Sequence, residues 1–67
     1  MTIDEFLAAD RCDVLCRVTL KSGEDLVFWV DGVASAKGQD FLTGVCGTGE
    51  ADTKHVPCDQ IAKVAIL

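Results

Sequence analysis

The first residues of the chain carry apolar side chains with the spacing of one helical face. Ile3, Phe6 and Leu7 stand at positions i, i+3 and i+4. Thr2 and Glu5 have the separation of a capping box, in which each side chain binds a backbone amide at the start of a helix. The sequence therefore predicts a short helix over residues 2–9. A helix of this length depends on docking its apolar face for its stability.

From residue 14 onward the period of the pattern changes to two, which is typical of strands. A second apolar run, residues 26–30, is rich in β-branched and aromatic side chains. Ser22–Asp25 lies between the two runs and offers a turn at Gly23. We expect a hairpin of two strands, in which Leu26, Phe28 and Val30 share one face of the second strand and Val27, Trp29 and Asp31 share the other.

The rest of the chain predicts three more short strands. After a looser stretch over residues 31–40, strands are expected at 41–46, 54–58 and 63–67, with a flexible turn at 47–52. Pro57 lacks an amide donor, so it is expected at a sheet edge or a strand end. Residues 59–61 predict a single helical turn capped by Asp59.

Five short strands and one helix in 67 residues indicate a single, mainly β domain. We expect a small five-stranded antiparallel barrel, SH3-like or Sm-like, with a short N-terminal α-helix in residues 1–10 and the barrel in 13–67. Closure of the barrel would hide the strand edges. An open sheet with the helix packed on one face is the structural alternative.

The composition restricts the structural class and the cellular location that we expect for the protein. Hydrophobic residues make up 49% of the chain, which is too apolar for a disordered segment. Residues 1–5 lack the basic and apolar regions of a secretory signal, and no uncharged run approaches the ~20 residues that span a bilayer. A cytoplasmic location without membrane contact is therefore expected.

The formal charge of −5 is unevenly distributed. The net charge is −3 over residues 1–13, +2 over 14–23, −5 over 24–52 and +1 over 53–67. Direct nucleic-acid binding needs clustered Lys and Arg, which the sequence lacks, so no direct nucleic-acid ligand is expected. The acidic surface suits a protein partner with a basic surface, although such charge also keeps small domains soluble.

The four cysteines include candidate ligands for a metal site. Cys12, Cys16, Cys58 and His55 could supply a Cys₃His zinc set, with Cys46 as an equal candidate. The two-residue spacing of zinc knuckles is absent, and Cys16 and Cys58 share strand faces with apolar residues. Core packing is therefore the favoured interpretation, ahead of a metal site or disulfides, and no cofactor is expected.

Catalytic interpretations are weaker than structural ones. A pair of His55 with Cys46 or Cys58 lacks an oxyanion hole and an orienting group, and so small a domain has little volume for a pocket. The acidic pairs at 4–5 and 24–25 point in different directions and are typical of solvated turns. The glycines at 44, 47 and 49 lack the lysine and helix of a phosphate loop. We therefore expect no enzymatic activity.

Trp29 has two interpretations. Opposite the face of Phe28, it is either covered by the apolar face of the N-terminal helix or exposed. If exposed, it would form an apolar patch rimmed by Asp25, Asp31 and Asp40, which is typical of a protein-binding or self-association surface. The covered state is the more ordinary packing.

Two stretches resemble a known family. The predicted helix followed by residues 18–26 (VTLKSGEDL), and later residues 56–64 (VPCDQIAKV), look like the small Rho-binding antiterminators. The resemblance implies an Sm-like barrel with an N-terminal helix and an acidic surface that docks on the transcription termination factor Rho where RNA would bind. The strand of Trp29 and residues 34–38 match nothing distinctive in that family, and the Asp and Met-Asn signature of uridine-binding Sm proteins is missing.

These observations predict a small acidic non-enzymatic protein-binding module. It would regulate by docking on a basic nucleic-acid-binding protein such as a transcription termination factor, through Glu24, Asp25, Val27, Trp29 and Asp31. One alternative is an oligomeric Sm-like RNA-binding ring with a pore lined by Lys37, Lys54 or Lys63. The other is a zinc-stabilised interaction module. A homo-oligomer is compatible with the first two.

Overall fold

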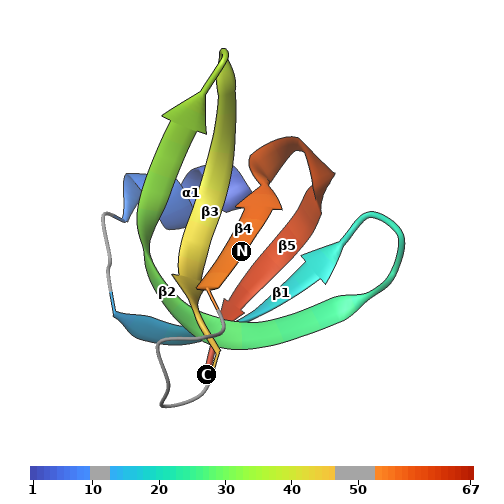
Figure 1. Cartoon of the computed structure of the whole chain (residues 1–67). Coiled ribbons are helices and arrows are strands. Elements are labelled where there is room, and N and C mark those ends of the chain that lie inside the picture. Colours follow the sequence, from blue (N-terminus) through green and yellow to red (C-terminus); the bar gives the residue numbers. More distant parts are fainter. Residues whose placement is uncertain (10–12, 47–52) are drawn as a thin grey trace.

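The computed structural model describes residues 1–9, 13–46 and 53–67, which form one short helix and a five-stranded antiparallel sheet (Figure 1). The strand order in the sheet is β4-β3-β2-β1-β5. The elements are α1 (Ile3–Ala8), β1 (Val14–Leu20), β2 (Asp25–Ala36), β3 (Gln39–Val45), β4 (Thr53–Pro57), the 3₁₀ turn η1 (Cys58–Gln60) and β5 (Ile61–Ile66). The mainly β class, the five antiparallel strands and the N-terminal helix are thus confirmed.

β1 and β2 form the expected hairpin. Their register pairs Cys16 with Phe28 and Val18 with Leu26. Gly23 closes the turn with φ +95°, a left-handed conformation that an L side chain rarely adopts. The alternation predicted from sequence is confirmed, because Cys16, Val18, Phe28 and Val30 are all buried.

β2 is longer than the sequence predicts. It continues to Ala36, so residues 31–36 are strand rather than a looser stretch. The register with β3 shifts between Val30 and Gly32, and at this irregularity β2 bends sharply, passing from its pairing with β1 to its pairing with β3 (Figure 1). Lys37 and Gly38, both with positive φ, then make a two-residue turn of the type I′ kind.

β4 and η1 lie close to their predicted positions. Pro57 is the last residue of β4, which is an edge strand, so its predicted place at a sheet edge or a strand end is confirmed. The 3₁₀ turn that follows begins at Cys58 and has no side-chain cap. The prediction of Asp59 as the cap was wrong, because Asp59 lies inside the turn, where it accepts a hydrogen bond from the Gln39 amide at 3.4 Å.

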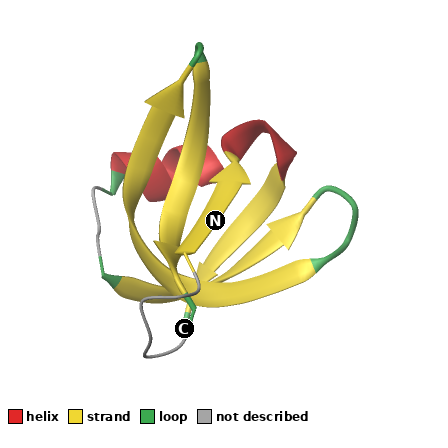
Figure 2. Ribbon diagram, in the orientation of Figure 1, coloured by secondary structure: helices red, strands yellow, loops and turns green. Residues whose placement is uncertain are grey.

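The core lies on one face of the bent sheet, and α1 closes it. Phe6 is the buried residue of α1, while Ile3 and Leu7 pack at the margin. Figure 2 shows α1 beside the sheet, and the helix contacts β5. The buried cluster consists of Phe6, Cys16, Val18, Phe28, Val30, Leu42, Val56, Ile61 and Val64.

The predicted capping box at the start of α1 is confirmed. The Glu5 amide donates to Thr2 Oγ1 at 3.1 Å, and the Thr2 amide donates to Glu5 Oε1 at 2.9 Å. The second bond, reinforced by the Thr2 side chain, holds the pKa of the Glu5 carboxyl below its ordinary value.

The sheet is not closed into a full barrel. β4 and β5 stand at its two ends, so the edges are not hidden by pairing with each other, and the observed sheet is the open alternative. Part of the β5 edge is covered in another way. The Met1 ammonium donates to the Val64 carbonyl and the Val64 amide donates to the Met1 carbonyl, both at 2.7 Å.

Several sequence predictions fall outside the described residues. These are the flexible turn at 47–52, most of the glycine pattern that begins at Gly44, and the place of Cys12 in a metal set. Within the parts of the chain that are described, no helix has the length and apolar character needed to cross a bilayer.

Candidate functional site

Four of the five residues predicted to bind protein form one row along β2. Asp25, Val27, Trp29 and Asp31 alternate with the buried Phe28 and Val30, so they lie on the face of the sheet opposite the core, here called the outer face. The fifth residue, Glu24, is exposed in the turn that precedes β2. The strand period thus places an acid, two apolar side chains and a second acid side by side.

Trp29 is exposed. Trp29 retains 45% of its accessible surface and Val27 retains 46%. The interpretation in which α1 covers Trp29 was wrong, because α1 inserts Phe6 among the buried residues on the other face of the sheet. One helix cannot cover both faces of the sheet. The alternation of side chains along β2 puts Phe28 and Val30 on the face that α1 covers and Trp29 on the opposite face.

The outer face extends the apolar surface around Trp29 across neighbouring strands. Trp29 pairs with Leu15 on β1 and with Val45 on β3, and both neighbours are half-buried. Directly paired residues on one face of a sheet have Cβ atoms about 5 Å apart, so the three side chains are in reach of each other. Sequence reasoning missed Leu15 and Val45, since only the register brings them beside the tryptophan.

Neighbouring hydroxyl groups hold the two carboxylates of the row in place. Thr19 Oγ1 donates to Asp25 Oδ1 at 2.7 Å, and Thr43 Oγ1 donates to Asp31 Oδ1 at 2.8 Å. Each carboxylate keeps lone pairs for a partner, because an ionised carboxyl group accepts about four hydrogen bonds. The bonds reduce the side-chain entropy that a partner would otherwise have to remove.

The rim of this surface differs from the prediction in two ways. Arg17 on β1 pairs with Val27, so a cation borders the row on one side. Asp40 does not belong to the rim, because it lies two residues before the buried Leu42 and so on the core side of β3, where its charge acts on Cys58. The surface is therefore acidic at the two ends of the row and mixed in charge along its β1 side.

The structure does not assemble the zinc set drawn from sequence. Cys16 is fully buried in the core, while His55 is exposed and alternates with the buried Val56, which places it on the outer face. Cys46 and Cys58 pack partly buried against the core. Within residues 1–9, 13–46 and 53–67, no three potential ligands form a metal-binding group. Core packing is confirmed for Cys16, Cys46 and Cys58.

Two of these thiols are poor nucleophiles. Burial raises the pKa of Cys16. Burial also raises the pKa of Cys58, and the negative charges of Asp40, Asp59 and Asp4 raise it further. Because the thiolate is the reactive form, these environments oppose nucleophilic chemistry.

Alkylation rates should therefore separate the cysteines. With iodoacetamide at pH 7.5, Cys16 is expected to react only as fast as the protein unfolds, and Cys58 at a rate that still rises with pH above 9. Mass spectrometry of peptides over time and pH measures both rates, with the denatured chain as the control. Labelling of native Cys16 as fast as in the denatured chain would contradict the observed burial.

The candidate site is thus an exposed surface on the outer face of the sheet. Its features are an exposed tryptophan, flanking apolar side chains and two carboxylates whose positions are set by threonine hydroxyl groups. Comparisons with protein-family models, with curated proteins and with solved structures found no match to this chain.

Proposed function

We propose that this chain is a small acidic non-enzymatic protein-binding module that docks the β2 row on a basic surface of a larger protein. The partner class is a nucleic-acid-binding protein, such as a transcription termination factor, whose nucleic-acid site the module would occlude. The observation that carries the proposal is the exposure of Trp29 between the carboxylates of Asp25 and Asp31 on one strand face.

The physical chemistry of this row suits protein recognition. Tryptophan is enriched among residues that dominate binding energy, because it buries a large rigid surface at little cost in entropy. Val27 and Leu15 extend the apolar area that a partner would cover, and the carboxylates would meet its Lys and Arg side chains. The overall charge of −5 would also speed the encounter with a basic surface.

We further propose that the fold is an SH3-like or Sm-like small barrel in its open form. The support is the strand order β4-β3-β2-β1-β5, the sharp bend of β2 and the single 3₁₀ turn between β4 and β5. This fold is compatible with the resemblance to the Rho-binding antiterminators, which motivates Rho as the first partner to test.

Binding to purified Rho, measured by biolayer interferometry, tests the function. Trp29→Ala is expected to weaken binding by at least about 30-fold, because it removes the apolar centre of the surface. The double reversal Asp25→Lys/Asp31→Lys is expected to weaken it at least as much. Capture from a cell lysate, followed by mass spectrometry, extends the test to other basic nucleic-acid-binding proteins.

A matched control separates a local effect from a change in net charge. Asp40→Lys/Asp59→Lys makes the same charge change on residues outside the β2 row and is expected to weaken binding less than about threefold. Equal losses in the two double variants, or binding that Trp29→Ala leaves unchanged, would contradict the proposal. Direct RNA binding with a steep salt dependence would favour the ring-forming alternative instead.

A further inference from the structure

The fold brings together the two segments of positive net charge. Residues 14–23 and 53–67 are separated by the strongly acidic segment 24–52, yet β1 and β5 are neighbours in the sheet. Arg17 pairs with Ala65 and Thr19 pairs with Lys63, so Arg17 and Lys63 are diagonal neighbours on the outer face. An acidic protein thereby acquires one local cationic site.

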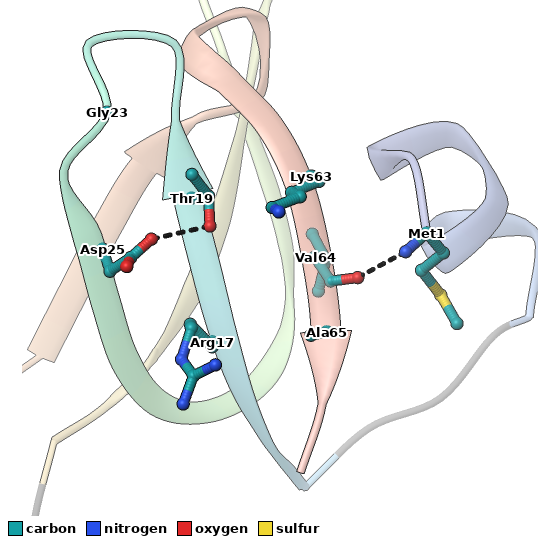
Figure 3. A pocket seen from close by; sticks show the side chains of 8 residues that line it. All are labelled: Met1, Arg17, Thr19, Gly23, Asp25, Lys63, Val64 and Ala65. Atoms are coloured by element: carbon teal, nitrogen blue, oxygen red, sulfur yellow. Dashed lines mark hydrogen bonds between the residues drawn. The ribbon is translucent and has the colours of Figure 1, made fainter.

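This cationic site lies in a depression of the protein surface. Arg17, Thr19, Asp25 and Lys63 line a depression of about 480 Å³ together with Met1, Gly23, Val64 and Ala65 (Figure 3). Its size is that of a small-molecule site. The register of β1 and β5 shifts between Thr19 and Leu20 beside the depression. Such an irregularity twists the strands locally and re-aims side chains.

The two basic side chains in the depression, those of Arg17 and Lys63, have no hydrogen-bond partner among the residues that line it. Figure 3 shows two hydrogen bonds there, from Thr19 to Asp25 and from Met1 to Val64, and neither involves Arg17 or Lys63. The carboxylate of Asp25 is thus held by a neutral hydroxyl group. The guanidinium and ammonium groups remain available to a ligand.

The spacing suits one oxyanion. Diagonal neighbours on a sheet face have Cα atoms roughly 7–8 Å apart, and both side chains are long enough to converge on a group between them. A guanidinium group binds two oxygens of a phosphate at once, and an ammonium group adds a point charge. The exposed apolar side chain of Ala65 would lie against the remainder of the ligand.

We propose that the depression between Arg17 and Lys63 binds a phosphate group, carried either by a small phosphorylated molecule or by a phosphorylated side chain. Asp25 lines the same depression and repels an oxyanion, so it sets an upper limit on the affinity. This site shares Asp25 with the β2 row, but the inference does not depend on the docking of a basic surface on that row.

NMR titration of the ¹⁵N-labelled chain with pyrophosphate, in a phosphate-free buffer of low ionic strength, tests the proposal. Saturable shifts are expected for amides of Arg17, Thr19 and Lys63. Arg17→Gln and Lys63→Gln should each weaken binding about tenfold. Asp25→Asn, whose side-chain oxygen can still accept the Thr19 hydroxyl, should strengthen it about threefold. Parallel titrations with inorganic phosphate and with a phosphoserine peptide distinguish the two sources of the phosphate group.

Lys37→Gln is the control, because it removes one positive charge from the β2–β3 turn and should leave the affinity within twofold. The proposal is overturned if pyrophosphate shifts are spread over the surface without saturation, or if Lys37→Gln weakens binding as much as Lys63→Gln does. It is also overturned if Asp25→Asn weakens binding. All four variants change exposed side chains, and their dispersed spectra would report that the fold is intact.

Discussion

Replacing Gly44 with alanine is expected to destabilise the protein by at least about 3 kcal/mol. Gly44 lies buried in β3, where a Cβ atom would overlap the backbone oxygen of Trp29 and stand 2.6 Å from Cδ2 of Phe28. Neither neighbour can yield easily, since the oxygen belongs to the paired strand and the ring is fully buried in the core. A domain of this size has roughly 3–10 kcal/mol of stability in total, so the substitution would remove a large fraction of it.

Gly32→Ala is the matched control for this prediction. Gly32 is also a strand glycine of the β2–β3 pair, but a Cβ atom there would meet only Thr43 Oγ1, at an ordinary 3.9 Å. Its expected change in the free energy of unfolding is within about 1 kcal/mol of zero. Urea denaturation followed by circular dichroism measures both variants. If Gly44→Ala were as stable as Gly32→Ala, the close approach of β2 and β3 would be wrong.

This close contact also explains one limit of sequence-based reasoning. Gly44 falls inside the predicted strand 41–46, where its lack of a side chain has no visible purpose. Its reason is the backbone of Trp29 on another strand, in a part of the β2–β3 pair next to the register shift between Val30 and Gly32. A pattern along one strand carries no information about such a shift.

Sequence patterns correctly predicted the features that depend on residues close together in the chain. The capping box of Thr2 and Glu5, the hairpin turn at Gly23 and the end of β4 at Pro57 each depend on neighbours in the sequence, and each was predicted. The extension of β2 was not, because residues 33–36 include weak strand formers and the turn at Lys37 lacks the favoured Asn-Gly pair. Pairing with β3 stabilises this part of β2 although its residues have a low intrinsic preference for strands.

For the candidate site too, features set within one strand were predicted, and features set by packing between elements were not. Alternation placed Asp25, Val27, Trp29 and Asp31 on one strand face correctly. It could not decide which face α1 covers, nor place Arg17 beside Val27, because these depend on packing between elements. The charge sums indicated two basic segments, but only the β1–β5 pairing made them one site.

Phe6→Ala is expected to destabilise the protein by about 3–5 kcal/mol. Phe6 is 2% exposed and is the one residue of α1 in the buried cluster. A six-residue helix has no stability of its own, so loss of this contact should also release α1 from β5. The matched control is Phe41→Ala, which removes the same atoms from a half-buried position on β3 and should cost about half as much or less.

Hydrogen exchange can separate release of α1 from unfolding of the whole sheet. The Val64 amide donates to the Met1 carbonyl, so its protection depends on the segment that precedes α1, whereas the other strand edge of β5 pairs with β1. In Phe6→Ala, Val64 should exchange at least about 100-fold faster under native conditions, and more than the paired amides of β1 and β2. Release would also bare the β5 edge, so concentration-dependent association should appear in sedimentation. If the Val64 amide kept its wild-type protection, α1 would not be held in place through Phe6.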